Sequence, residues 1–569
     1  FNVWKQPAAG GYPVQLTFFA NRSTRNLAWS RDGKTILFNA DKDGDEFHQL
    51  FTIPAQGGSP TQLTDVLDAT HLIGSGAFSP DGKWIAYATN AQDRASVNPV
   101  LLNLETGEER RLIQRDGNFF PAGWSPDGKH LLVGHSLSNT NSDIYLVDVK
   151  TGEAKNLTPH QGDIGYAPGP WSREKGKRGF YFVADEMGEH TALGFYDLKK
   201  NSRAWVETPE WDVEDVAVSR DGRLLAWTVN EDGNSRLHVR YLQTGRTKAL
   251  PKMPQGVIQF MSFAPNKQNI ALLMSGAGFC VQPFILHLKA NKLHALTQSM
   301  LGGIKPAAMV EPKLIRYPSF DGRKVPAWLY KPKGLKPGRK VGVVLSVHGG
   351  PEAQERLTYN YTGMYQYWLS RGIGVLATNI RGSTGYGKTY QKLIHRDWGG
   401  GELQDMEHAV EYLHSLDWVD PNRIGFFGGS FGGFACLSCV TRLPDKFAAA
   451  VDLFGPSNLI TFVNSVPPWW KRYMKEWVGD ADQDRDFLVE RSPITYVDRI
   501  RTPLYIIQGA NDPRVVQAES DQIVEKLRAR NVPVKYDVFP DEGHGFTKRA
   551  NELKALGSSA EFLEQYLNG

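Results

Sequence analysis

The sequence has few cysteines and no long apolar run, and each absence excludes a class of protein. There are 3 cysteines in 569 residues, too few for a disulfide framework. Two of them, Cys436 and Cys439, lie in an apolar helical pattern, where we expect buried thiols. No stretch approaches the roughly 20 uninterrupted apolar residues of a membrane helix, so we expect no association with a membrane.

An excess of charge of one sign is also absent. Lys and Arg number 65 against 61 Asp and Glu, which leaves a formal net charge of +4. Over a chain of 63.5 kDa, this excess is too small to attract nucleic acid electrostatically. The sequence contains no H-E-x-x-H motif and no P-loop string. We therefore expect no nucleic-acid partner, no metal and no other cofactor.

No targeting segment is visible at the amino end. The chain starts at Phe1, and residues 1–16 already alternate like a strand, which is unlike a signal or transit peptide. We expect that something upstream has been removed or left out, and that the protein is cytoplasmic. Its oligomeric state is left open, with a homo-oligomer as one alternative.

One turn recurs throughout the first half. An aromatic or apolar residue, a serine, an Arg or Pro, and then Asp-Gly return about every 47 residues. Asp-Gly favours a turn because Gly accepts positive φ and Asp bonds its own backbone. Hairpins separate the copies, and a period of this size with such hairpins predicts four-stranded propeller blades. Clear copies begin at Trp29, Phe78, Trp124 and Val218, and weaker ones at Trp171 and Phe263.

The repeat sets the expected blade count. Six units fill residues 19–299, and residues 3–17 resemble the outer hairpin of one more blade. That blade either lacks its inner strands or takes them from sequence that is not present here. We therefore predict a seven-bladed β-propeller over residues 1–299, with its first blade incomplete in this chain. An array of β-sandwiches is the alternative, but sandwiches do not repeat at this period with one turn chemistry.

The period changes after Ser299. Residues 301–312 form a linker that contains Gly and Pro, and strand patterns then alternate with helical ones. Val341–Val347 is a continuous apolar run, typical of a strand buried on both faces of a parallel sheet. We therefore predict an open α/β domain over residues 300–569, with its ligands beyond the carboxyl ends of the strands. Further strands are expected at 374–379, 424–427, 448–454 and 504–508, and helices at 403–416 and 518–529.

A candidate nucleophile follows one of these strands. Ile424–Phe427 leads into Gly-Gly-Ser430-Phe-Gly-Gly and then into a helix expected to begin near Phe434. G-x-S-x-G between a strand and a helix is the nucleophile elbow of α/β-hydrolases. The string alone is weak, because a glycine-rich turn explains it equally well. The order of a serine, an acid and a histidine along the chain makes Ser430 the predicted nucleophile.

The acid and the base also follow strands. Asp512 lies beyond Leu504–Gln508, where a carboxylate can hold the tautomer of a histidine; capping of a helix is its alternative role. His544 lies between two glycines beyond Val534–Phe539. The chain has 14 histidines, and His348 is the serious competitor for the role of base.

These motifs, behind a repeat propeller, resemble the prolyl oligopeptidase family of serine peptidases, and most closely its acylaminoacyl-peptidase branch. His348–Pro351, Arg381–Gly387 and Trp398–Gly400 are similar to further signatures of that family. The resemblance spans the whole chain. It implies a β-propeller joined to an α/β-hydrolase domain, with Ser430, Asp512 and His544 as the catalytic triad.

The same resemblance suggests the other site residues. The backbone amides of Phe431 and Gly350 would form the oxyanion hole, although other branches use a tyrosine hydroxyl where this chain has His348. Arg514 would bind a substrate carbonyl, with a surface salt bridge as its alternative role. The specificity pocket, with a preference for bulky apolar side chains, would be lined by Trp470, Tyr473 and Met474, unless this aromatic run is plain core or domain interface.

The predicted function is hydrolysis of short peptides through an acyl-enzyme, by an acylaminoacyl-peptidase or an oligopeptidase. A propeller that caps the site would exclude folded proteins and water. A carboxylesterase or amidase of the same fold is one alternative, and a non-catalytic scaffold is disfavoured by the intact triad. A dipeptidyl aminopeptidase is a further alternative, but this activity needs paired carboxylates that bind the free amino terminus of the substrate. Asp45-Glu46 and Glu214-Asp215 are the candidates for that pair.

Overall fold

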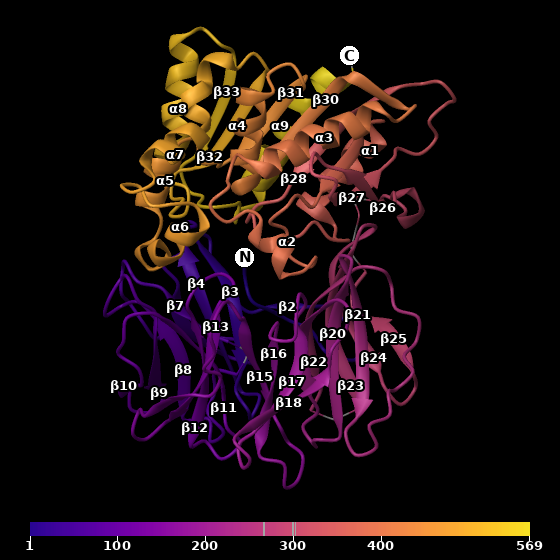
Figure 1. The fold of residues 1–569 in the computed structure, drawn as a ribbon. Coiled ribbons are helices and arrows are strands. Elements are labelled where there is room, and N and C mark those ends of the chain that lie inside the picture. The colour runs from indigo at the N-terminus through magenta and orange to yellow at the C-terminus, as the bar shows by residue number, and fades with distance from the viewer. Residues whose placement is uncertain (75, 266–267, 299–300, 302, 569) are drawn as a thin grey trace.

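The chain folds into a β-propeller and an α/β-hydrolase domain stacked on each other, as seen in a computed structural model (Figure 1). The structure describes residues 1–74, 76–265, 268–298, 301 and 303–568. The propeller lies below the hydrolase domain in Figure 1, and the amino terminus lies between the two. The predicted domain boundary at residues 299 and 300 falls outside the described residues.

Six antiparallel sheets make up the propeller within the described residues. From the first strand outward, the first three are β3 (Arg22–Trp29), β4 (Thr35–Lys42), β5 (Gln49–Pro54) and β6 (Thr61–Gln62); β7 (His71–Leu72), β8 (Trp84–Thr89), β9 (Asn98–Asn103) and β10 (Glu109–Arg111); and β11 (Asn118–Trp124), β12 (His130–Ser136), β13 (Ser142–Asp148) and β14 (Ala154–Asn156). The other three are β15 (Tyr166–Trp171), β16 (Gly179–Ala184), β17 (Ala192–Asp197) and β18 (Ser202–Glu207); β19 (Asp212–Val218), β20 (Leu224–Glu231) and β21 (Asn234–Tyr241); and β22 (Val257–Phe263), β23 (Asn269–Gly276), β24 (Phe279–His287) and β25 (Lys292–Ala295).

The amino-terminal residues form a separate two-stranded hairpin, β1 (Trp4–Lys5) and β2 (Val14–Gln15). It falls within residues 3–17, where a hairpin of a seventh blade is expected; the described residues form six blades and this separate hairpin. The repeated turn follows the first strand of each clear copy, and its serine and aspartate bond each other. In the first copy, the Ser30 hydroxyl donates to Asp32 Oδ1 at 2.6 Å, and the Lys34 amide donates to the same oxygen. These bonds explain why this turn chemistry recurs.

The hydrolase domain is built on one eight-stranded sheet with the order β26-β27-β29-β28-β30-β31-β32-β33. Strands β28 to β33 run parallel, and β27 pairs antiparallel with both β26 and β29. The strands are β26 (Lys313–Pro318), β27 (Lys324–Tyr330), β28 (Val341–Val347), β29 (Gly374–Thr378), β30 (Val419–Gly429), β31 (Ala449–Leu453), β32 (Leu504–Gly509) and β33 (Val534–Phe539).

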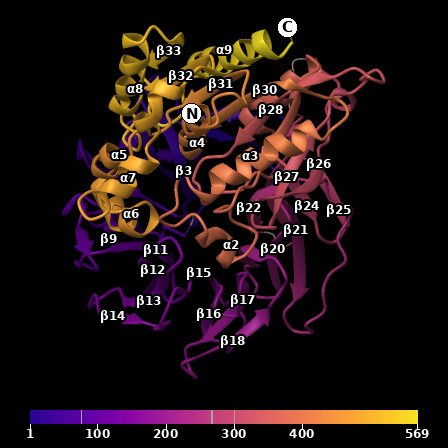
Figure 2. The ribbon, with the colours of Figure 1, turned by 45° about the horizontal axis from the view of Figure 1, so that its top comes forward.

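Helices cover both faces of this sheet (Figure 2). Helices α3, α4 and α8 pack on one face, and α1 and α9 pack on the other. The helices are α1 (Met364–Ser370), α2 (Lys388–Lys392), α3 (Gly401–His414), α4 (Phe431–Arg442), α5 (Leu459–Ser465), α6 (Lys471–Trp477), α7 (Arg485–Arg491), α8 (Gln517–Ala529) and α9 (Arg549–Leu567). Among the described residues, no helix is both long and apolar enough to span a bilayer.

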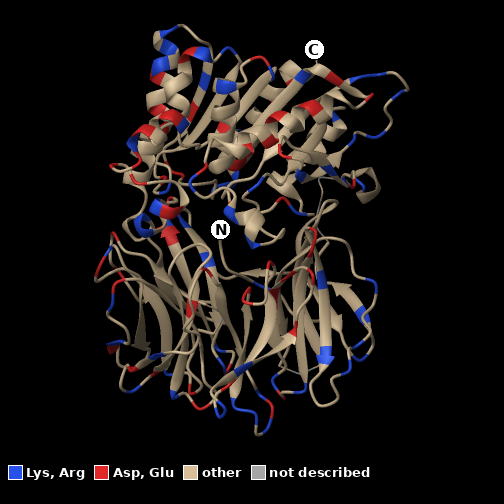
Figure 3. Cartoon of the chain, viewed as in Figure 1, with Lys and Arg blue, Asp and Glu red and all other residues tan. Residues whose placement is uncertain are grey.

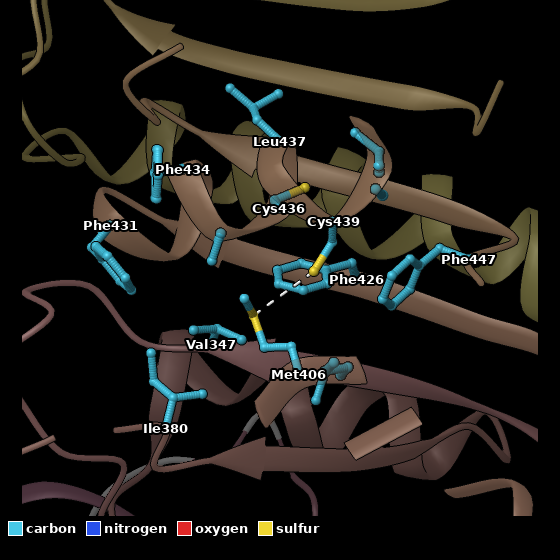
Figure 4. Packing of buried hydrophobic residues seen from close by; sticks show 14 of the residues in the cluster. Val347, Ile380, Met406, Phe426, Phe431, Phe434, Cys436, Leu437, Cys439 and Phe447 are labelled. Carbon is cyan, nitrogen blue, oxygen red and sulfur yellow. Dashed lines mark hydrogen bonds between the residues drawn. The ribbon is translucent and has the colours of Figure 1, made fainter. Parts of the chain in front are cut away.

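The central strand shows why the apolar runs are continuous. Every residue of β28 is buried, with Val343 and Leu345 in the core beneath α3 and α4 and Val344 in the core beneath α9. The predicted burial of Cys436 and Cys439 in α4 is confirmed. Cys439 Sγ lies 3.8 Å from Met406 Sδ of α3 (Figure 4). Both sulfurs therefore fill the space between helices and sheet, as small apolar groups do.

Candidate active site

Ser430 lies in a tight turn between β30 and α4. Its φ of 58° and ψ of −120° are sparsely populated for a residue with a side chain, and such strain is typical of functional sites. The turn is held because the Ser430 amide donates to the Leu453 carbonyl at 2.9 Å, and the Gly433 amide donates to the Ser430 carbonyl at 2.9 Å. The strained turn presents the hydroxyl beyond the carboxyl end of β30.

The glycines of this turn are required by close contacts. A Cβ atom on Gly432 would lie 2.2 Å from the Val347 carbonyl oxygen, and one on Gly433 would lie 2.2 Å from Asp452 Oδ1. Both glycines belong to α4, which begins at Phe431 rather than near Phe434 as predicted. The first turn of α4 thus packs directly against the sheet. The Phe431 amide is one of those that a helix start leaves without an intrahelical acceptor.

His544 and Asp512 are paired. His544 Nδ1 lies 2.6 Å from Asp512 Oδ2, and both side chains are almost fully buried. Asp512 Oδ1 accepts from the amides of Arg514 and Val515, each at 2.9 Å. Asp512 is thus oriented by its own loop, and it holds the Nδ1–H tautomer of His544, which leaves Nε2 available to a hydroxyl.

Phe454 links the histidine to the serine turn. Its ring centroid lies 4.7 Å from that of His544. The same ring lies 3.4 Å from the position of a Cβ atom on Gly429, the residue before Ser430. The structure therefore brings the loops of Ser430, Asp512 and His544 together at one end of the sheet.

The competing histidine is engaged elsewhere. His348 Nε2 lies 2.8 Å from the Ser383 hydroxyl, and Nδ1 lies 2.7 Å from the Gly349 carbonyl oxygen. Burial lowers the pKa of His348 to about 4, so the ring is neutral at pH 7. The loop that follows approaches the nucleophile, because a Cβ atom on Gly349 would lie 3.2 Å from Ser430 Cβ. Gly350, the predicted oxyanion donor, is the next residue in this loop.

A loop of the propeller packs against the histidine loop. Gly44, between β4 and β5, is so close to Gly543 that a Cβ atom on Gly44 would lie 2.3 Å from the Gly543 amide nitrogen. Asp43 accepts from Lys548 Nζ at 2.7 Å through its side chain and from Asn511 Nδ2 at 3.0 Å through its carbonyl. The propeller is therefore part of the wall that holds His544 in position.

Beside this contact lies a cavity of about 520 Å³ between the domains. Glu46 from the propeller and Arg514 from the hydrolase domain meet on its wall, with Glu46 Oε2 accepting from Arg514 Nε at 2.9 Å. The Arg514 guanidinium also lies over the Trp470 ring, 5.4 Å from its centroid. Asp45 and Asp68 are among the other lining residues. Two of the predicted substrate-binding residues, Arg514 and Trp470, therefore border one cavity.

Two other predicted pocket residues lie elsewhere. Met474 is buried in the hydrophobic core. The Tyr473 hydroxyl accepts from Asn118 Nδ2 of the propeller. Neither is among the described residues that line the cavity. Trp470 ends the short 3-10 turn Pro468–Trp470 that precedes α6, whereas Tyr473 and Met474 lie inside α6.

The two candidate acid pairs line different cavities. Asp45 and Glu46 border it, whereas Glu214 and Asp215 line the channel of the propeller. Glu214 is held there by Arg356 of the hydrolase domain, at 2.6 Å and 3.2 Å. The sequence pattern did not show that Glu46 and Arg514 would be partners, because 468 positions separate them. Among the described residues, no group of three or more His, Cys, Asp or Glu side chains is arranged to hold a metal ion.

Comparison with known proteins agrees with this geometry. Residues 359–569 match the description of the prolyl oligopeptidase family. The whole chain is 31% identical to a dipeptidyl aminopeptidase BIII of Pseudoxanthomonas mexicana over 84% of that protein. It is 39% identical to dipeptidyl peptidase family member 6 of Caenorhabditis elegans over 82% of that protein. A puromycin-hydrolyzing peptidase of Mycobacterium tuberculosis shares the fold, with a TM-score of 0.84, 22% identity, and coverage of 98% of this chain and 90% of that one. The chain therefore belongs to the prolyl oligopeptidase family and is a serine-type peptidase.

Proposed function

We propose that this peptidase is a dipeptidyl aminopeptidase, which removes two residues at a time from a free amino terminus. The observation that carries the proposal is the contact between Glu46 and Arg514 on the wall of the interdomain cavity. Two relatives at 31% and 39% identity bear names of dipeptidyl peptidases, which supports the same activity. The proposal replaces the acylaminoacyl-peptidase favoured by the sequence.

The charges in the cavity suit an ammonium group. Three carboxylates line it, on Asp45, Glu46 and Asp68, against the guanidinium groups of Arg94 and Arg514. His48 also lines it, but burial lowers the pKa of this histidine, so at neutral pH it adds no positive charge. The excess of negative charge favours a cation in the cavity.

The proposal requires a spacing of two residues between the carboxylate and the scissile carbonyl. Extended peptide spans at most about 3.6 Å per residue, so two residues place the terminal nitrogen about 7 Å from the scissile carbonyl. Arg514 is close to the reaction centre, because its amide donates to the carboxylate that orients His544. Its guanidinium can donate to a substrate carbonyl while the Glu46 carboxylate accepts from the ammonium group. An N-acyl group would remove the charge that Glu46 attracts.

The proposed chemistry follows from the three catalytic side chains. Ser430 Oγ attacks the carbonyl while His544 Nε2 takes its proton, and the amides of Phe431 and Gly350 stabilise the oxyanion. Asp512 keeps His544 in the required tautomer through the contact at Nδ1. His544 then gives the proton to the departing amine, and water releases the dipeptide in the second half of the cycle.

The test compares p-nitroanilides of free dipeptides with the same compounds after N-acetylation. We expect acetylation to lower kcat/KM by at least 100-fold. Glu46→Gln should lower kcat/KM for the free dipeptide by about 10- to 100-fold, which corresponds to the loss of one hydrogen bond to a charged group. The variant should leave the acetylated substrate unaffected. The matched control is Glu105→Gln, which breaks an exposed pair with Lys83 on the second blade.

The pH profile gives an independent readout. The α-amino group of a peptide substrate has a pKa of about 8. Above that pH, kcat/KM for free dipeptide substrates should therefore fall, whereas kcat/KM for acetylated substrates should not. Preferential cleavage of N-acetyl-aminoacyl substrates would contradict the proposal and favour the acylaminoacyl activity. Turnover of esters without any turnover of peptides would favour the carboxylesterase.

A further inference from the structure

The repeated turn of the propeller carries an arginine in three copies. The residue after the serine is Arg31 in the first blade, Arg173 in the fourth and Arg220 in the fifth, whereas other copies have Pro80 and Pro126. The turn itself does not need an arginine, because its serine, aspartate and backbone supply the hydrogen bonds. All three arginine side chains are exposed. Their role therefore lies outside the folding of the turn.

The three arginines converge on the propeller channel. They line one cavity of about 580 Å³, together with residues of β3, β11, β15 and β19. Although their side chains reach solvent, the walls of the cavity take part of their hydration away. This partial burial and the charges of Arg31 and Arg220 lower the pKa of Arg173, and partial burial and the charge of Arg220 lower the pKa of Arg31. Three blades thus bring their positive charges close enough to repel one another.

This cluster lies at the end of the channel that faces away from the catalytic domain. The loops between the second and third strands contact the hydrolase domain: Glu46 pairs with Arg514, and Asp185 pairs with Lys388 of α2. Asp163, just before the first strand of the fourth blade, pairs with Lys392 of α2. Each inner strand begins near that face and ends at the repeated turn, about 20 Å further along. The side of the propeller that faces the hydrolase domain carries acidic groups by contrast, among them Glu46, Asp163 and Asp185, and Figure 3 shows red segments on this side.

The acidic groups nearby are engaged elsewhere. Among the described residues, no carboxylate oxygen lies within 4.0 Å of a nitrogen of these three guanidinium groups. Glu174, next to Arg173, accepts from Lys177. Glu214, nearer the hydrolase domain in the same cavity, is held by Arg356 of that domain, and burial raises the pKa of Asp215. The positive charge of the cluster is therefore not neutralised by the chain.

We propose that Arg31, Arg173 and Arg220 bind a polyvalent phosphate at this end of the propeller channel. Guanidinium groups donate pairs of parallel hydrogen bonds that match phosphate oxygens. One carboxylate would neutralise one arginine, whereas a pyrophosphate group offers enough charge and oxygen atoms for three. Trp29 and Trp171 line the same cavity, so the phosphate can be inorganic or part of a small organic molecule with an aromatic ring.

The test measures binding of pyrophosphate by isothermal titration calorimetry at constant ionic strength in chloride buffer. We expect one site per chain. Each of Arg31→Ala, Arg173→Ala and Arg220→Ala should weaken binding about tenfold, as expected for one charge-assisted hydrogen bond. The triple variant should lose binding altogether. Arg223→Ala is the matched control, because Arg223 belongs to the same turn as Arg220 but pairs loosely with Asp221 and does not line the cavity.

Thermal unfolding separates binding from folding. Removal of mutually repelling charges should leave the melting temperature without ligand unchanged or higher, while the rise caused by pyrophosphate disappears in the triple variant. Tighter binding of ADP than of pyrophosphate would support the proposal and assign an organic phosphate as the ligand; equal binding would support inorganic phosphate. The proposal is wrong if wild type shows no binding at millimolar pyrophosphate, or if the triple variant binds as tightly as the control.

Discussion

Gly44 of the propeller and Gly543 of the hydrolase domain meet backbone to backbone, with room for no side chain between them. A Cβ atom on Gly44 would lie 2.3 Å from the Gly543 amide nitrogen, and one on Gly543 would lie 1.9 Å from the Gly44 carbonyl oxygen. Because His544 follows Gly543, the position of the imidazole that we propose as the catalytic base depends on a loop from the other domain. The propeller therefore does more than restrict access to the site.

We predict that Gly44→Ala lowers kcat by displacing the histidine loop. The change forces a side chain into the contact and also strains a residue with φ of 81°. Gly33→Ala is the matched control, since Gly33 has φ of 71° but no atom within 4 Å of its Cβ position. Gly33→Ala should lose about 1 kcal/mol of stability through backbone strain, and Gly44→Ala should lose more because of the added contact with Gly543; thermal unfolding measures both. Equal kcat values for the two variants would show that the contact does not position His544.

We predict that Ser430→Ala abolishes labelling by a fluorophosphonate probe and lowers kcat by about six orders of magnitude, as loss of a triad member does elsewhere. Ser438→Ala in the same helix is the control, because its buried hydroxyl has no hydrogen-bond partner among the described residues. The control should be labelled like wild type. Persistent labelling of the Ser430 variant would exclude this serine as the nucleophile.

Trp470 and Met474 should respond differently to truncation, although only four positions separate them. Trp470→Ala should raise KM for substrates with bulky apolar side chains by about tenfold or more, because an apolar contact worth about 1.5–3 kcal/mol is lost. Met474→Ala should leave KM unchanged and lower the free energy of unfolding by about 2–5 kcal/mol. Steady-state kinetics and urea unfolding of both variants provide the measurements. A change of specificity in the Met474 variant alone would contradict the assignment.

Asp452 should make stability dependent on pH. Burial raises its pKa from 3.8 to about 7, and its Oδ2 has no hydrogen-bond partner among the described residues. Between pH 3.8 and about pH 7, the folded state holds a proton on Asp452 that the unfolded chain releases. The free energy of unfolding therefore falls as pH rises through this range. Relative to Asp452→Asn, wild type should lose on the order of 4 kcal/mol between pH 4 and pH 7.

Urea unfolding at several pH values measures this difference for both proteins. Asp445→Asn is the control, because the Asp445 side chain is 81% exposed and its removal should leave the pH dependence of wild type intact. A constant difference between wild type and the Asp452 variant across this range would mean that Asp452 is ionised in the folded protein.

Strand-turn-helix order determined much of the catalytic domain. Val341–Val347 has the predicted bounds, because a parallel strand buried on both faces needs a continuous apolar run and this signal is local. Val534–Phe539 also has the predicted bounds, although it is an edge strand in which apolar and polar residues alternate. Helix α4 begins three residues earlier than the sequence predicts. Glycine lowers helix propensity, but packing against Val347 and Asp452 keeps Gly432 and Gly433 helical.

The sequence by itself determined the period of the blades, the elbow around Ser430 and the loops that carry Asp512 and His544, because each depends on residues close together in the chain. Only the tertiary structure decided which acidic pair borders the interdomain cavity, since Glu46 meets Arg514 across 468 positions. The same holds for the convergence of Arg31, Arg173 and Arg220, and for the contact of Gly44 with Gly543. The physical reason is that closing the ring of blades and docking it on the hydrolase sheet bring together residues whose spacing in the chain carries no periodic signal.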